Sequence, residues 1–477
     1  MSNQGGVQAA IRSSTGTALD YNGDWHALFD QASIASGPFN GRMLQWINAQ
    51  LGVSYDSLPG AMQAFAVSQG FNNWSSMDTL TLSGASSLLA GETDGLAIDF
   101  TDMSMIVKDT GTPANAFTGD PNSKLTYASP STKWILNSAG ILVSGTTLRS
   151  EYDTAGNNLG ILNEPNQATN LALYSDDLTN AAWTVSNMTA AMTATGVDGV
   201  ANSATTITAT AGNATILQAI TSASASRITS CYIKRRTGSG TVNMTQDNGT
   251  TWAAVTVTSS WTRVSIAAAT LANPTVGLRL VTSGDAVDVQ FFQHELTASG
   301  VLAITSPIRT TSATVTRAAD NISLALASFP YVAATPQMIY VKFTLRSSPT
   351  VAGQIIDFGG FAANGKARGI YISSGGNVQC FDADGYVLVY NGAQAGVLSN
   401  GTTTKVATRH KANDFRSAKD GALGSADATG VLSTVTSGLT FGTLVSVSGG
   451  RSHCHIQEVV YLNREVLDAE LQSRTAA

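Results

Sequence analysis

Two carboxylates lie two positions apart in the segment Asp382-Ala383-Asp384-Gly385. Such a pair could bind Ca²⁺, which takes several oxygen ligands, or supply the acid and base of a glycosidase. The calcium-loop pattern is incomplete, because the third ligand position and the distal glutamate are missing. The favoured interpretation is therefore a polar turn between Phe381 and Tyr386.

Two imidazoles lie on one side of an expected strand in His453-Cys454-His455, as a metal pair requires. No further Cys or His follows nearby in the sequence, and His410 could join the pair only through folding. An ordinary strand start is the favoured interpretation, so neither a metal nor a cofactor is predicted. The catalytic motifs Gly-x-Ser-x-Gly and His-Glu-x-x-His, the phosphate loop and the dinucleotide fingerprint do not occur. We expect a protein that is not an enzyme.

Several aromatic residues lie close to polar ones, a combination that suits sugars, because rings stack on sugar faces while amides and carboxylates bind hydroxyls. The candidates are Tyr371, Asp384, Tyr386 and Tyr390 in the C-terminal part of the chain, and Trp252 in its middle. The alternative is that most of these rings alternate into the cores of their sheets. The pattern around Trp252 favours packing for that residue.

The composition excludes some classes of partner. Charged residues make up 12% of the 477 residues, about half the usual ~25%. The net charge of −6 argues against a nucleic-acid binder, whose affinity depends on clustered Lys and Arg. No apolar run reaches the ~20 residues that span a bilayer, so membrane insertion is not expected. The N-terminus also lacks a signal-peptide pattern, which predicts assembly in a cytoplasm.

The three cysteines, Cys231, Cys380 and Cys454, are far apart in the sequence, and we expect them to be buried as small apolar residues.

The first 80 residues are expected to form three short helices joined by Gly/Pro turns. This module is rich in aromatic residues, namely Trp25, Phe29, Trp46, Phe71 and Trp74. These rings either build its core or face a partner protein, and the sequence leaves both open. Residues 81–165 are irregular, with a few short β-like runs, and are expected to form a connector.

From residue 169 the pattern changes to alternating apolar and polar residues in short runs about ten residues apart, which is typical of antiparallel sandwiches. Asp247-Asn248-Gly249 is a favoured hairpin turn. The expected fold is mainly β: a small helical N-terminal module (1–80), the connector (81–165) and two antiparallel jelly-roll sandwiches (166–310 and 311–477).

The run from Asn170 to Thr184 (NLALYSDDLTNAAWT) resembles the opening segment of jelly-roll modules in tailed-bacteriophage tail and virion proteins. These modules are similar to carbohydrate-binding modules. The later segments SCYIK (230–234), GTTW (249–252) and WTRV (261–264) resemble the same modules. ANDF (412–415), KDG (419–421) and VYLNREVLDAEL (460–471) resemble the concanavalin A-like (laminin-G-like) domain of such proteins. The resemblance covers roughly two-thirds of the chain and concerns fold more than biochemical role.

The resemblance implies a phage structural protein, such as a tail fibre, head fibre, spike or decoration. We expect the helical module to anchor it to other virion proteins, and the sandwiches to project for attachment to host-surface polysaccharide. Fibres of this kind are commonly trimers, so a homo-oligomer is expected, although no residue fixes the stoichiometry. A polysaccharide depolymerase and a purely structural head, neck or tail decoration without a ligand are the alternatives.

Overall fold

The computed structural model describes residues 84–128, 131–296, 304–346, 353–359, 365–384, 387–442 and 452–476. The chain divides into two compact units, Met1–Gly91 and Glu92–Ala477. The described part of the first unit contains the short helix α5 (Ala85–Leu88). The predicted helical module over residues 1–80, with its five aromatic residues, lies outside the described residues.

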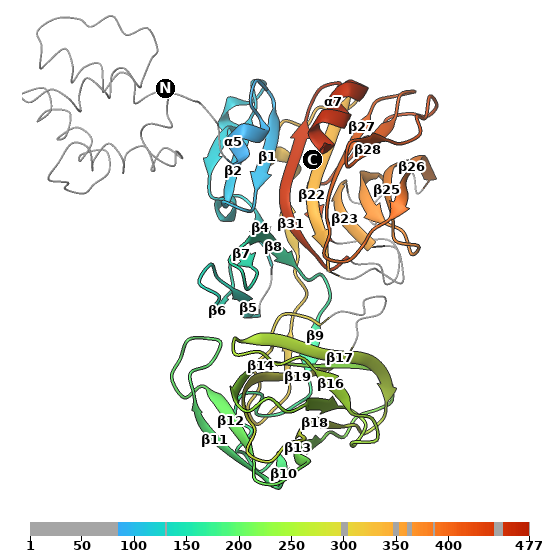
Figure 1. Ribbon diagram of the computed structural model, residues 1–477. Coiled ribbons are helices and arrows are strands. Elements are labelled where there is room, and N and C mark those ends of the chain that lie inside the picture. The colour runs from blue at the N-terminus through green and yellow to red at the C-terminus, as the bar shows by residue number, and fades with distance from the viewer. Residues whose placement is uncertain are drawn as a thin grey trace, which may run out of the picture. The chain divides into compact units, whose positions relative to one another are not determined.

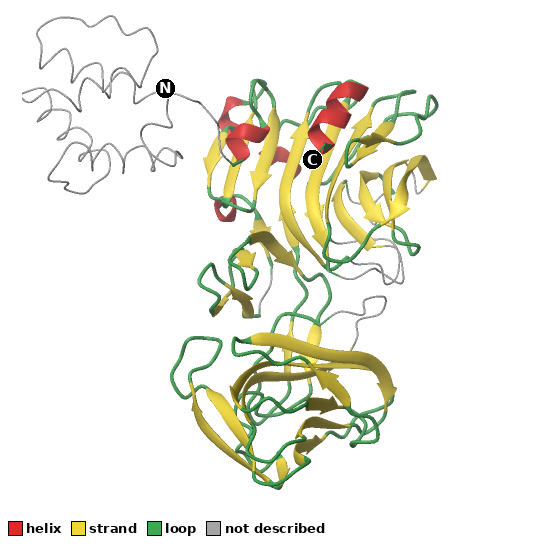
Figure 2. Cartoon of the chain, in the orientation of Figure 1, coloured by secondary structure: helices red, strands yellow, loops and turns green. Residues whose placement is uncertain are grey.

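The regular secondary structure of the second unit is mostly antiparallel strand (Figure 2), which confirms the predicted mainly β class with antiparallel sandwiches. One sandwich, here called the inserted sandwich, spans residues 168–317. Its first sheet has the order β11 (Met188–Ala194), β12 (Ala204–Ala209), β19 (Ala286–Leu296), β14 (Ala225–Thr237) and β17 (Thr262–Leu271), and β9 (Ala168–Asn170) joins β19 to β20 (Val315–Arg317). Its second sheet has the order β10 (Thr184–Ser186), β13 (Ala214–Ala219), β18 (Thr275–Leu280), β15 (Val242–Thr245) and β16 (Ala253–Val255). Ile207, Ile216, Cys231, Leu278 and Phe292 are among the buried residues between the two sheets.

The other sandwich, here called the split sandwich, combines residues 92–163 with residues 318–476. Its ten-stranded sheet has the order β29 (Ala422–Leu423), β28 (Arg416–Lys419), β27 (Thr403–His410), β22 (Gln337–Leu345), β31 (Cys454–Leu462), β1 (Gly95–Asp99), β2 (Ser104–Lys108) and β3 (Phe117–Gly119), and β8 (Asn158–Asn163) pairs with both β31 and β7 (Ser150–Tyr152). Its second sheet has the order β26 (Val387–Val397), β25 (Asn377–Asp384), β24 (Ala367–Ile372), β23 (Gly353–Phe358), β30 (Leu439–Phe441), β21 (Ile322–Leu324) and β4 (Thr126–Tyr127). The remaining elements are the hairpin β5 (Lys133–Leu136) and β6 (Leu142–Gly145), the 3-10 turns η2 (Pro113–Asn115), η3 (Pro121–Ser123) and η4 (Leu326–Ser328), and the C-terminal helix α7 (Asp468–Thr475).

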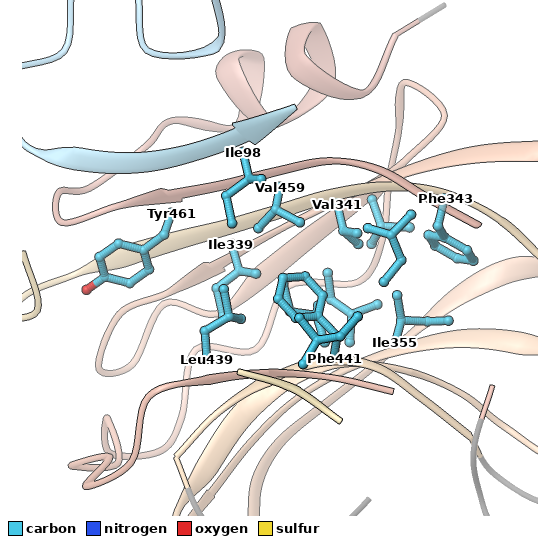
Figure 3. Packing of buried hydrophobic residues seen from close by; sticks show 14 of the residues in the cluster. Ile98, Ile339, Val341, Phe343, Ile355, Leu439, Phe441, Val459 and Tyr461 are labelled. Atoms are coloured by element: carbon cyan, nitrogen blue, oxygen red, sulfur yellow. The ribbon is translucent and has the colours of Figure 1, made fainter. Parts of the chain in front are cut away.

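The core of the split sandwich fills the space between its two sheets (Figure 3). Ile98, Val341 and Val459 come from the ten-stranded sheet and are fully buried. They lie over Leu439 and Phe441 of the facing sheet. Strands that precede the inserted sandwich in the sequence and strands that follow it therefore share one core.

The segment 81–165, predicted to be a connector with a few short strands, supplies strands to the split sandwich. β1 pairs with β31 along its whole length, with Leu96 opposite Tyr461 and Ile98 opposite Val459 (Figure 1). Every residue of β1 is buried, since the strand lies inside the sheet between β31 and β2. The predicted boundary at 310 is also displaced, because β20 still pairs with β9 of the inserted sandwich.

The pairing of β8 with β31 requires a glycine. Gly160 has a φ of +79°, and a Cβ atom there would lie 2.2 Å from the carbonyl oxygen of Ile456. Only glycine tolerates both this backbone conformation and this close approach of two strands.

The three cysteines are free and buried, as predicted. None of the described helices has the length and hydropathy that crossing a bilayer requires.

Candidate functional site

Three of the predicted sugar-binding residues have described side chains, namely Tyr371, Asp384 and Trp252, and the structure does not bring these three together. Tyr371 lies on β24 with its ring 5.7 Å from that of Phe381, and Asp384 at the end of β25 is 3.3 Å from the Lys366 ammonium. Tyr371 is opposite Gln379 in the β24–β25 ladder, five positions along the strand from Asp384. The backbone of Tyr390 pairs with Asp382, and Tyr386 lies outside the described residues.

Trp252 belongs to the other sandwich, and its ring is already in contact with protein groups. The Arg279 guanidinium lies 4.5 Å from the ring centroid, and a Cβ atom at Gly249 would approach the indole to 3.0 Å. Packing, the interpretation that the pattern favoured, accounts for these contacts.

The carboxylates of Asp382 and Asp384 do not form a pair. Asp382 is fully buried beside the Arg368 guanidinium at 3.5 Å and His410 Nδ1 at 3.3 Å, whereas Asp384 is partly exposed. β25 continues through Asp384, so the predicted polar turn does not include Asp382. The role of Asp382 is to neutralise a buried arginine.

Each of the two histidines on β31 or beside it has its own carboxylate partner. His453 Nε2 lies 3.2 Å from Glu164 Oε1, and His455 Nε2 lies 2.7 Å from Glu151 Oε2. Across the part of the chain that the structure describes, no cluster of three or more His, Cys, Asp or Glu side chains could hold a metal ion.

The second of these pairs lies in a cleft of about 350 Å³, here called the polar cleft, which is large enough for a small ligand. Its walls come from both sandwiches. The residues that matter below are Glu151 and Tyr152 on β7, Tyr232 on β14, Arg263 on β17, Arg346 after β22, and His455 on β31. Leu136, Leu159, Ile304 and Pro307 add apolar surface, and Asp153, Thr154, Thr262 and Ser306 add polar groups.

The charges in the polar cleft are ordered by hydrogen bonds. Burial raises the pKa of Glu151, but the hydrogen bond from His455 and the nearby Arg346 outweigh it and hold that pKa below its ordinary value. Burial lowers the pKa of His455, and Glu151 only partly offsets this. The pair is therefore an ionised carboxylate that accepts a hydrogen bond from a neutral imidazole.

Arg346 is the cation of the cleft with the most available donors. Its guanidinium lies 3.8 Å from Glu151, beyond hydrogen-bond reach, and its side chain is 25% exposed. Arg263, in contrast, is held in place: it donates to the carbonyl oxygen of Thr305 and to Ser230 Oγ, and it lies over the Tyr232 ring. A ligand in the cleft could therefore accept hydrogen bonds from Arg346, whereas Arg263 already donates to protein groups.

The β5–β6 hairpin fixes the wall of the cleft on the side of Tyr232. Leu136 and Leu142 pack with Tyr232 and Phe291 of the inserted sandwich, and the Trp134 ring lies 5.1 Å from that of Phe291. The backbone N–H of Leu142 also donates to the carbonyl oxygen of Val197 at 2.9 Å. Binding groups held this rigidly lose little entropy when a ligand binds.

The sequence contains little signal for this cleft. Its residues come from seven separate parts of the chain. Tyr232 and Arg263 belong to the segments SCYIK and WTRV, but those segments pointed to a module and not to a binding site. The sequence pattern indicated His455 only as a possible metal ligand. Its hydrogen-bond partner Glu151 lies 304 positions away in the sequence.

Comparison with protein-family models gave no match, and comparison with the curated proteins gave none either. Among solved structures, the chain is similar to the CBM40 of the Ruminococcus gnavus IT-sialidase, solved with alpha2,3 sialyllactose, at 14% identity and a TM-score of 0.26, over 30% of this chain and 84% of that one. It is also similar to domain 4 of AbnA, a GH43 arabinanase from Geobacillus stearothermophilus solved with arabinotriose, at 12% identity and a TM-score of 0.27, over 33% and 73% of the two chains. A Trypanosoma rangeli sialidase matches at 14% identity and a TM-score of 0.27, over 32% of this chain and 25% of that one. At these TM-scores we transfer neither a function nor a site residue.

Proposed function

We propose that this protein is a structural component of a tailed-bacteriophage particle and that its polar cleft binds a glycan of the host surface. The observation that carries the binding proposal is the lining of the cleft. It combines tyrosine rings and apolar side chains with an available guanidinium and two carboxylates in about 350 Å³.

Such a lining suits a sugar because a sugar ring has apolar faces and a rim of hydroxyl groups. Tyr152, Leu159 and Pro307 supply apolar surface for the faces. Glu151 and Asp153 are acceptors for hydroxyl groups, while Arg346 is a donor. Hydrogen bonds to such charged groups are among the stronger ones in proteins.

The polysaccharide depolymerase is less well supported than binding. The carboxyl groups that line the cleft are those of Glu151 and Asp153. The pKa of Glu151 is lowered, and hydrogen bonds from Asn157 and the backbone lower the pKa of Asp153. A glycosidase needs one carboxylic acid whose pKa is raised, so that it can protonate the leaving group. Reducing ends released from host polysaccharide would contradict the binding-only role.

Removal of the Arg346 side chain is expected to weaken glycan binding about tenfold or more, because a charge-assisted hydrogen bond contributes about 1.5–3 kcal/mol. The measurement is titration of the full chain and of R346A with host-surface polysaccharides that a glycan array has first identified. The matched control is R279A, which removes the same charge from the face beside Trp252, outside the cleft. A loss in R279A with none in R346A would assign binding to the Trp252 face instead. If the wild-type chain bound none of the host glycans, only the structural role would remain.

The particle location is supported by the sequence segments that resemble virion modules and by a compositionally distinct N-terminal part. We expect that deletion of residues 1–80 prevents incorporation into particles while the two sandwiches still fold. The measurement is the amount of the chain in purified particles, with circular dichroism of the isolated variant as the folding control. Normal incorporation of the truncated chain would contradict the anchor. A homo-oligomer, with the trimer as the form to test first, remains part of this proposal.

A further inference from the structure

A group of charged side chains is buried where the chain enters and leaves the inserted sandwich. Its central members are Lys133 on β5, Glu164 just after β8, and Asp320 between β20 and β21. The side chains of these three residues are 9%, 1% and 0% exposed, and Arg317 lies beside them at 1%. Four charged side chains with so little access to water must be closely paired, because an unpaired buried charge is energetically costly.

The lysine and the aspartate are in direct contact. Lys133 Nζ contacts Asp320 Oδ2 and also donates to the carbonyl oxygen of Leu162 at 2.8 Å. The Asp320 carboxyl group accepts further hydrogen bonds on both oxygens, from the backbone N–H of Glu164 at 2.7 Å and from the Tyr127 hydroxyl at 2.9 Å. Hydrogen-bond donors in these positions stabilise the negative charge that develops on carboxyl oxygens when a nucleophile attacks the carboxyl carbon.

One oxygen of Glu164 accepts a backbone hydrogen bond, and the other faces two cations. Its Oε1 accepts from the backbone N–H of Ser306 at 2.6 Å. Its Oε2 is buried and has no hydrogen-bond partner among the described residues, but it lies 3.5 Å from Arg317 Nε and 3.8 Å from Lys133 Nζ. Burial raises the pKa of Glu164, but Arg317, His453 and Lys133 outweigh it and hold that pKa well below its ordinary value. An ionised carboxylate oxygen is thus placed next to the ammonium group.

We propose that Lys133 and Asp320 join in an intramolecular isopeptide bond, with Glu164 as the group that moves the protons. Lys133 Nζ gives up a proton to Glu164 Oε2 and attacks Asp320 Cγ, so that a new N–C bond forms. The two protons that the nitrogen loses pass through Glu164 to one Asp320 oxygen, whose bond to Cγ breaks. The products are an amide and one water molecule, and nothing is oxidised or reduced.

The surroundings provide what this condensation needs. The nucleophile and the electrophile are held together by the fold, which replaces a bimolecular encounter. Burial lowers the pKa of Lys133 but both carboxylates outweigh it, so the net shift is upward and the amine must pass a proton to Glu164 before it attacks. A cavity of about 10 Å³, lined in part by Tyr127, Lys133 and Leu162, is the size of the one water molecule that is released.

The bond would have a mechanical consequence. It joins positions that are 187 residues apart and encloses the whole inserted sandwich within one covalent loop. A cross-link across the two crossing segments prevents them from separating when the inserted sandwich is pulled. This role is independent of any ligand in the polar cleft.

The test is the mass of the full chain under denaturing conditions, followed by peptide mapping. The wild-type chain is expected to be lighter than its sequence by one water molecule, and a branched peptide should connect the segment of Lys133 to that of Asp320. K133R is expected to have its full mass, whereas K342R, which changes a lysine that pairs with Glu458 at 2.7 Å, should keep the deficit. E164Q should form the bond at least about a hundredfold more slowly, the low end for loss of a general acid–base group.

A wild-type chain with the full mass of its sequence would overturn the proposal and leave a plain ion pair. A deficit that maps to a linear peptide, such as a cyclic imide at Asp320, or that persists in K133R, would overturn it as well. If K133R fails to fold, the peptide map of the wild-type chain decides alone.

Discussion

Replacement of Asp382 with alanine is expected to lower the free energy of unfolding of the split sandwich by about 3–5 kcal/mol, the usual cost of leaving a buried charge without its partner. The affected charge is the Arg368 guanidinium, which is completely buried. Arg368 also donates to Gln337 Oε1 at 2.6 Å and to the carbonyl oxygen of Ser433, but Asp382 is its carboxylate partner. Asp382 in turn accepts from the backbone N–H of Ser433 at 3.2 Å, so its loss also removes support from that segment.

The matched control is Asp384→Ala, two residues further along the same strand. Its ion pair with Lys366 is about one-third exposed on both sides, so its loss should cost at most about 1 kcal/mol. Urea unfolding of the two variants and of D382N, which keeps the size of the side chain, separates the lost charge from the cavity. Equal losses in D382A and D384A would contradict the buried network.

Replacement of Asp357 with asparagine is expected to stabilise the split sandwich increasingly as the pH rises. Asp357 lies on β23 beside Thr440, and burial raises the pKa of its carboxyl group to about 7. The folded chain therefore keeps this proton to a higher pH than the unfolded chain, whose pKa is near the ordinary 3.8. The group contributes its full stability below about pH 4 and loses it as the pH rises toward 7.

Asparagine imitates the protonated acid at every pH, so the advantage of D357N over the wild-type chain should grow by roughly 3 kcal/mol between about pH 4.5 and pH 8. The measurement is the difference in unfolding free energy between the two chains across that pH range. The titrations of all other groups are common to both chains and cancel in this difference. A difference that does not vary with pH would show that Asp357 is ionised in the folded chain.

The sequence by itself determined the secondary-structure class and many of the strands. The alternating run over residues 227–234 lies within β14 (Ala225–Thr237), and the run over 455–462 lies within β31. The burial of Cys231, Cys380 and Cys454 was also predictable. These features depend on neighbours in the sequence, because alternation in a strand directly sets which residues face the core.

Only the tertiary structure decided which strands share a sheet and which side chains share a cleft. β1 is an ordinary apolar run until it pairs with β31, and nothing local to either segment specifies the other. Glu151 meets His455, and Lys133 meets Asp320, across chain separations that include the whole inserted sandwich. A strand edge can pair with any compatible partner, so the choice depends on the packing of the complete core and not on the residues beside it in the sequence.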